Sequence, residues 1–98
     1  MARFDVYRVR GEPYAVDCQS DVFSRLNSRL VVPLRPAHMV PAVAPRLNPV
    51  LKFDGLDLRL VPQAARAIRT KEIEATIGSL SEQDVTILAA MDMLISGY

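Results

Sequence analysis

Residues 50–60 read Val-Leu-Lys-Phe-Asp-Gly-Leu-Asp-Leu-Arg-Leu, and this stretch decides the fold class. Its central Asp54-Gly55 pair favours the positive φ angles of a two-residue type I′ turn. After the turn, leucines alternate with charged residues, which is typical of a strand with one buried face and one solvated face. We therefore predict a β-hairpin here and a mainly β protein.

Further β-prone runs lie on both sides of this hairpin. Leu30-Val31-Val32-Pro33-Leu34 is the strongest of them. We expect residues 29–34 to cross the middle of a sheet and the strand to end at Pro33, because proline cannot donate a ladder hydrogen bond. The same reasoning predicts strands at 4–9 and 14–18, short edge strands at 67–70 and 73–77, and a helical turn at 64–67.

Five prolines between positions 33 and 49 exclude a regular strand or a long helix from that segment. We predict an ordered loop or a single helical turn, anchored by Met39, Val40 and Val43.

The 98-residue length predicts one domain over residues 1–98. Half of the residues are hydrophobic, so we favour a homodimer over an unusually apolar monomer. The 12 basic and 11 acidic residues are mixed along the chain, and this pattern does not indicate direct nucleic-acid binding. We find neither a signal peptide nor a run of about 20 apolar residues, and therefore expect a cytoplasmic protein that contacts no membrane.

Catalytic and metal-binding motifs are absent from the sequence. Cys18 is the single cysteine and is interpreted as a small core residue, and the single histidine, His38, as a loop residue. Asp17 and Asp21 are interpreted as solvated surface carboxylates. We predict no catalytic residue, no metal and no cofactor.

The last element is the most informative one. Ser81 is expected to cap a helix over about residues 81–96, and Gly97 to stop it. Because this helix is apolar over most of its circumference, the sheet alone cannot cover it. A second subunit, a flanking loop or a target protein is left as its other neighbour. Val22 and Phe23 are also notable, since an apolar pair in a loop either contacts a partner or packs back into the core.

Five segments in order along the chain are similar to the CcdB family, the toxins of type II toxin–antitoxin modules that poison DNA gyrase. They are Phe4-Asp5-Val6-Tyr7, Val16-Asp17-Cys18-Gln19-Ser20-Asp21, Arg29-Leu30-Val31-Val32-Pro33-Leu34, Leu47-Asn48-Pro49-Val50 and Met91-Asp92-Met93-Leu94-Ile95-Ser96-Gly97-Tyr98.

This resemblance implies an SH3-like barrel, or twisted antiparallel sheet, with a C-terminal helix. It also implies a homodimeric, non-enzymatic inhibitor that binds the gyrase A subunit and traps the enzyme on cleaved DNA. A cognate antitoxin neutralises it, and nucleic acid is reached only through the antitoxin complex. The implied gyrase-binding residues are Val22, Phe23, Asp92, Ile95, Ser96, Gly97 and Tyr98.

Two alternatives remain open. The best-known family member ends in Trp-Gly-Ile, whereas this chain ends in Ser96-Gly97-Tyr98. Loss of the tryptophan favours a homologue that binds antitoxin as a co-repressor without poisoning gyrase. The related MazF-type endoribonuclease toxins share the barrel, but their chemistry would need a basic groove and an acid/base pair, for which only the arginines and His38 are available.

Overall fold

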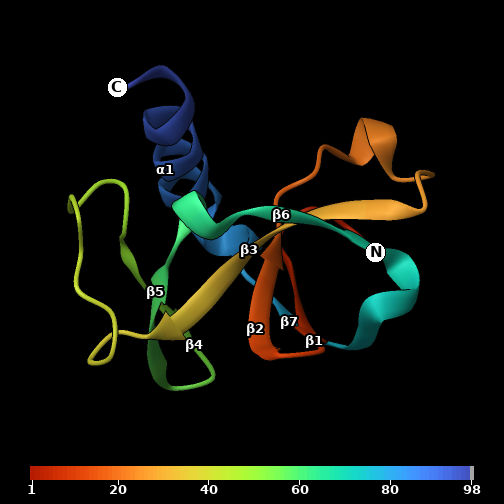
Figure 1. Ribbon diagram of the computed structural model, residues 1–98, viewed down its shortest axis with the longest axis horizontal. Coiled ribbons are helices and arrows are strands. Elements are labelled where there is room, and N and C mark those ends of the chain that lie inside the picture. The colour runs from red at the N-terminus through yellow and green to blue at the C-terminus, as the bar shows by residue number, and fades with distance from the viewer. Residues whose placement is uncertain (98) are drawn as a thin grey trace.

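The computed structural model describes residues 1–97, which form seven strands, four short 3₁₀ helices and one α-helix (Figure 1). The strands are β1 (Asp5–Val9), β2 (Glu12–Asp17), β3 (Ser28–Pro36), β4 (Val50–Phe53), β5 (Leu56–Leu60), β6 (Arg66–Arg69) and β7 (Ile73–Ser79). The 3₁₀ helices are η1 (Asp21–Phe23), η2 (Pro62–Ala64), η3 (Thr70–Glu72) and η4 (Ser81–Gln83), and the α-helix is α1 (Asp84–Ser96).

Within residues 1–97 the strands form one curled antiparallel sheet, in the order β4-β5-β3-β2-β1-β7, with β6 paired to β3. This architecture confirms the prediction of a mainly β fold with a barrel-like sheet and a C-terminal helix. In the part of the chain that the structure describes, no helix is long and apolar enough to cross a membrane.

β3 occupies the centre of the sheet, as predicted, but its end was placed wrongly. The strand continues through Pro33 to Pro36. At Pro33 the pairing with β2 ends, and from Leu34 onward β3 pairs with β5 instead. The missing N–H of Pro33 therefore falls where the strand changes partner, and its carbonyl still accepts a hydrogen bond from Val61 N at 3.0 Å.

The β4–β5 hairpin confirms the reasoning from Asp54-Gly55. Asp54 has φ 53° and Gly55 has φ 77°, both in the left-handed region that a type I′ turn requires. Leu58 and Leu60 of β5 are buried, whereas the charged residues between the leucines lie toward solvent.

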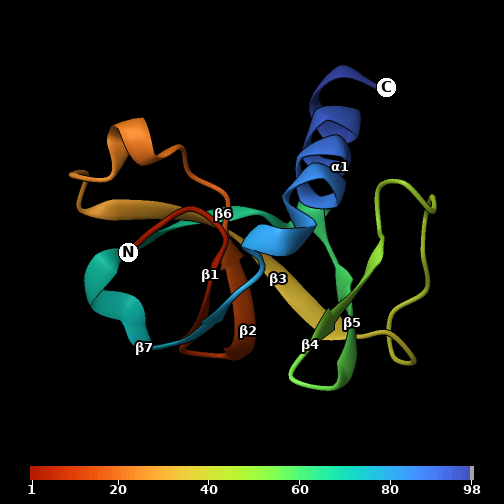
Figure 2. The ribbon, with the colours of Figure 1, turned by 180° about the vertical axis from the view of Figure 1, so that it is seen from behind.

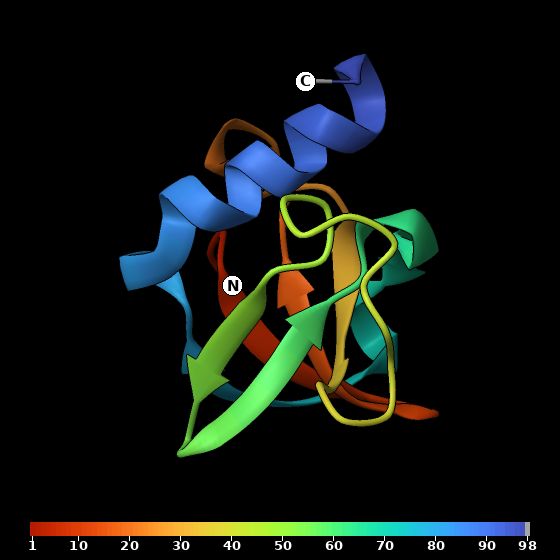
Figure 3. The same ribbon diagram turned by 90° about the vertical axis from the view of Figure 1, so that its left-hand side faces the viewer.

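The core consists of two clusters on opposite faces of the central strands. The larger one includes Val6, Val16 and Val32 together with Ile87 and Ala90 of α1. The smaller one consists of Tyr7, Val9, Ala15, Val31 and Ile68. Because both faces of β3 are covered, its apolar residues run continuously and do not alternate with polar ones. Figure 3 shows α1 lying across the top of the curled sheet.

The proline-rich segment after β3 is an ordered loop, as predicted, but its anchors are different. Met39 and Val43 are 70% and 78% exposed, so the prediction that they hold the loop was wrong, whereas Val40, the third predicted anchor, is half-buried. The buried Asn48 does so instead. Its amide nitrogen donates to Leu60 O at 3.1 Å, and its Oδ1 accepts from Val43 N at 2.9 Å. A loop has few backbone partners of its own, and a buried amide can satisfy several of them at once.

The start of the last helix also differs from the prediction. Residues 81–83 form the 3₁₀ helix η4, and the Ser81 side chain makes no capping hydrogen bond. The buried Leu80 and a hydrogen bond from Gln83 Nε2 to Lys52 O, 2.9 Å long, fix this end to the sheet instead. Gly97, with φ 80°, ends the helix as predicted, and its N–H donates to Met93 O.

The predictions for the segments between β5 and the last helix were nearly right. β6 and β7 occur where edge strands were expected, whereas the helical turn lies at Pro62–Ala64 and not at 64–67. Residue Pro62 has the fixed φ angle that starts such a turn, and this moves the turn toward the N-terminus.

Candidate functional site

The turn η1 presents two apolar side chains to solvent. Val22 is 83% exposed and Phe23 is 56% exposed, so the alternative in which Phe23 packs back into the core was wrong. The turn itself is closed locally, because Phe23 N donates to Ser20 O and Val22 N donates to Ser20 Oγ. Exposed apolar side chains held on a short ordered turn are suited to contact another protein.

Sequence reasoning missed a third member of this surface. Leu26 is 52% exposed and, with Cys18, Phe23 and Leu30, lines a hollow of about 470 Å³ beside the turn. The available signal was its spacing, since Leu26 follows Phe23 by three residues and its N–H donates to Phe23 O. We call Val22, Phe23 and Leu26 the turn surface.

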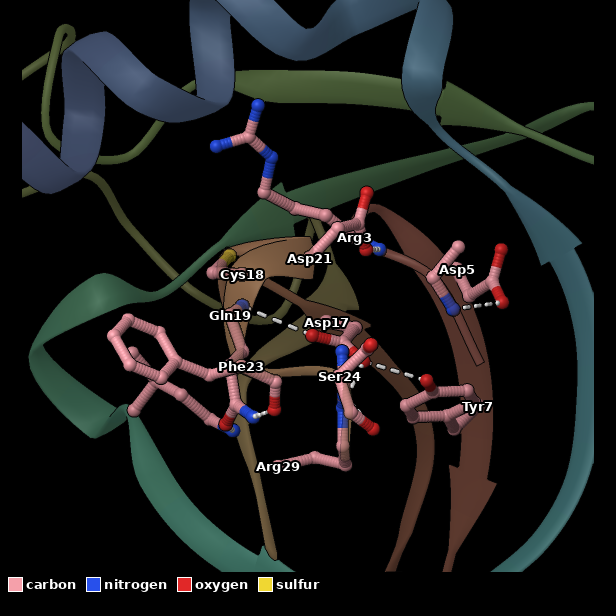
Figure 4. Close-up of polar contacts among 12 residues, drawn as sticks. Arg3, Asp5, Tyr7, Asp17, Cys18, Gln19, Asp21, Phe23, Ser24 and Arg29 are labelled. Atoms are coloured by element: carbon pink, nitrogen blue, oxygen red, sulfur yellow. Dashed lines mark hydrogen bonds and ion pairs between the residues drawn. The ribbon is translucent and has the colours of Figure 1, made fainter. Parts of the chain in front are cut away.

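A buried charge cluster lies beneath the turn (Figure 4). The Asp17 and Arg29 side chains are both fully buried, and Arg29 Nε donates to Asp17 Oδ2 at 2.7 Å. Tyr7 Oη donates to the same oxygen at 2.6 Å. The interpretation of Asp17 as a solvated carboxylate was therefore wrong, whereas Asp21 is exposed. The missed signal was its place next to Val16 at the end of an apolar strand.

The surroundings of this cluster change the pKa values of Tyr7 and Arg29. Burial, followed by the hydrogen bond to Asp17, raises the pKa of Tyr7 above its ordinary range. The hydrogen bond to Asp17 also raises the pKa of Arg29. Both shifts favour the protonated forms of Tyr7 and Arg29, which are the forms that donate hydrogen bonds to Asp17.

The end of α1 forms a second exposed surface. Asp92, Ile95 and Ser96 all face solvent, and Ile95 is 77% exposed. Gly97 turns the chain away from the helix axis. Tyr98, the last of the predicted contact residues, lies outside the described residues. Ile95, Ser96 and Gly97 form what we call the helix-end surface, with Asp92 one turn before them.

The turn surface and the helix-end surface do not merge on one chain. Figures 1 and 2 show the segments that carry them, η1 and the end of α1, above the curled sheet and at opposite sides of the view. The predicted contact residues are thus divided between two separate places that point to the same end of the molecule.

The comparison with protein families gives one match, to the family model described as CcdB protein, over residues 3–97. The chain belongs to the CcdB family. Members of the CcdB family are toxins of toxin–antitoxin modules and not catalytic enzymes. A search among curated proteins found no matching relative.

Three further side chains with possible chemistry, in Cys18, His38 and Arg35, have the following surroundings in this CcdB family member. Burial raises the pKa of the Cys18 thiol to about 12, so the nucleophilic thiolate does not form at neutral pH. His38 is exposed at the edge of a hollow lined by Tyr14, Leu56 and Asp57. Arg35, three residues before His38, donates to Glu12 at 3.1 Å. Among residues 1–97, no group of three or more histidine, cysteine, aspartate or glutamate side chains is placed to hold a metal ion.

Proposed function

We propose that this chain is a toxin that binds the A subunit of DNA gyrase and traps the gyrase–DNA cleavage complex. The observation that carries the proposal is the exposure of Val22 and Phe23 on an ordered turn, in a member of a toxin family. The proposed contact residues are Val22, Phe23, Asp92, Ile95, Ser96, Gly97 and Tyr98.

Trapping has a thermodynamic requirement. A bound protein shifts gyrase toward its cleaved state only if it binds that state more tightly than the resealed state. Moving the ratio of the two states from 1:99 to 99:1 takes a preference of about 10⁴-fold. The toxin therefore acts by contacting surfaces that gyrase exposes in the cleaved complex, and it needs no catalytic residue of its own.

With Ser96 in the helix-end surface, we expect the turn surface to contribute a larger share of the binding free energy. Tryptophan is among the commonest binding hot spots, and truncating such a residue typically costs at least about 2 kcal/mol of binding free energy. This chain carries the small, exposed Ser96 at the position of the family tryptophan. Phe23 and Ile95 then provide the largest apolar contacts that the two surfaces offer.

The proposed dimer depends on other exposed residues of α1. Val85 and Leu94 of α1 remain exposed after the helix has packed on the sheet. Because these two side chains are nine residues apart, they lie on opposite sides of the helix. Our proposal places a second copy of the chain against the side that carries Leu94, giving a homodimer in which each copy supplies one turn surface and one helix-end surface. A cognate antitoxin, folding as it binds, neutralises the dimer in the cytoplasm and provides its route to DNA.

The test is a cleavage assay with purified gyrase and supercoiled plasmid. The chain should produce linear DNA linked to protein after denaturation. Replacing both Val22 and Phe23 by alanine should abolish this product. Val43→Ala is the matched control, because Val43 is as exposed as Val22 but lies on the proline-rich loop. Equal loss with the control would overturn the assignment of the turn surface.

A second candidate, a homologue that binds antitoxin without poisoning gyrase, is favoured by Ser96 alone. It predicts antitoxin binding with no cleaved complexes from the gyrase of any host. RNA cleavage in the absence of gyrase would instead indicate the endoribonuclease alternative.

A further inference from the structure

The turn surface lacks the packing that normally fixes a loop. Val22, Phe23 and Leu26 all face solvent, and none of the residues in η1 is buried. Residues 18–27 lie between β2 and β3 and belong to no strand. Within this segment Cys18 packs against the larger core cluster, and η1 itself is held by hydrogen bonds, including one from Arg3 N to Asp21 Oδ1 at 2.8 Å.

The Gln19 side chain joins the turn to the sheet (Figure 4). Its Oε1 accepts from Leu30 N of β3 at 3.0 Å, and its Nε2 donates to Phe23 O at 2.9 Å. One amide thus holds the last residue of η1 at a fixed place relative to the central strand. Because the amide uses both its acceptor and a donor, neither a purely donating nor a purely accepting side chain can replace it.

The buried cluster in turn fixes Gln19. Asp17 Oδ1 accepts from Gln19 N at 2.9 Å, while Oδ2 of the same carboxylate is held by Tyr7 and Arg29. Arg29 Nη1 donates to Ser24 O at 3.5 Å, so the guanidinium also reaches the far end of the turn. The segment is thereby tied to buried groups both before and after η1.

We propose that Gln19, oriented by Asp17, is a positioning residue that orders the turn surface for gyrase before the two proteins meet. This inference rests on the proposed function, in which Val22 and Phe23 contact gyrase. A surface that is ordered in advance loses less conformational entropy on binding. Gln19 is itself half-buried behind the turn, and it acts through the position of Phe23.

The variant that tests this is Gln19→Leu, which keeps the size of the side chain and removes both hydrogen bonds. We expect amide hydrogen exchange to accelerate across residues 20–26, with the protection of β1 and β2 unchanged. Affinity for the purified gyrase A subunit should fall about tenfold, the order expected for ordering two interface side chains. Gln83→Leu is the matched control, since it removes a similar side-chain bond, from Gln83 Nε2 to Lys52 O, at the opposite end of α1 from the helix-end surface. It should leave both the exchange of residues 20–26 and the gyrase affinity unchanged.

A double-mutant cycle separates positioning from general destabilisation. In a background with Val22→Ala and Phe23→Ala, Gln19→Leu should cause no further loss of affinity. A full tenfold loss in that background would overturn the inference, as would unchanged exchange across residues 20–26 in Gln19→Leu. If the Val22→Ala/Phe23→Ala background itself keeps full gyrase affinity, the proposed contact fails and the role of Gln19 in gyrase binding fails with it. Unchanged exchange overturns the positioning role alone.

Discussion

Replacing Arg29 by methionine tests how the buried ion pair contributes to stability. The Asp17 and Arg29 side chains are fully buried and 2.7 Å apart, so Arg29→Met leaves a carboxylate charge inside the protein. Breaking such a pair typically costs about 3–5 kcal/mol. Arg29 Nη2 has no hydrogen-bond partner, and its own desolvation is therefore only partly compensated. We therefore expect Arg29→Met to lower the free energy of unfolding by about 3 kcal/mol, near the lower limit of that range. The total stability of a domain is about 5–15 kcal/mol.

A more discriminating result is the effect of Asp17→Asn on the free energy of unfolding, which should have opposite signs in the native chain and in the Arg29→Met background. In the native chain, Asp17→Asn removes the partner of a buried guanidinium and should destabilise the fold. In the Arg29→Met background the same substitution removes an uncompensated charge, so it should raise the free energy of unfolding. Tyr7 Oη and Gln19 N remain close enough to pair with the asparagine amide.

The assay is urea unfolding at pH 7 followed by far-UV circular dichroism, because the chain contains no tryptophan for fluorescence. All four proteins must be compared at one protomer concentration, since dimerisation would add to the apparent stability. A cost below about 1 kcal/mol for Arg29→Met would refute the reasoning. So would an Asp17→Asn substitution that destabilises both backgrounds equally, because the two charges would then be independent.

Two further predictions concern packing and pH. A Cβ at Gly78 would lie 2.6 Å from Phe53 Cε1, so Gly78→Ala should lower the free energy of unfolding by about 1–3 kcal/mol, and an unchanged thermal midpoint would contradict this. The pKa of the Cys18 thiol is raised from 9.0 to about 12, so above about pH 9 the unfolded chain loses a proton that the folded chain keeps. Stability should therefore fall as the pH rises from about 9 toward 12, and Cys18→Ala should make this fall less steep; identical pH profiles for the two proteins would contradict the assignment.

Several features of this protein could be predicted because they depend on residues close together in sequence. Asp54-Gly55 fixes a turn by its own φ preferences, and Gly97 stops a helix for the same reason. The continuous apolar run around Val31 and Val32 indicated a central strand. The family resemblance, carried by short local segments, is confirmed by the match over residues 3–97.

The candidate site was predictable only in part, for a related reason. The sequence indicated that Val22 and Phe23 are unusual for a loop, but it left their exposure open. Exposure depends on whether a distant segment covers them, and in the folded chain none covers Val22. Leu26 was missed because its spacing of three residues from Phe23, the one local signal, does not show whether the leucine is exposed or buried.

The sequence by itself indicated the central strand, the Asp54-Gly55 hairpin and the C-terminal helix, together with the family to which the chain belongs. The tertiary structure decided which polar residues are buried. Asp17 became part of the interior because β3 brings Arg29 beside it and β1 brings Tyr7. Asn48, and not the apolar residues Met39 and Val43, anchors the proline-rich loop because β5 and η2 present the acceptors for its amide. A buried polar group is stable only where its partners converge, and those partners lie 10 to 15 residues away along this chain.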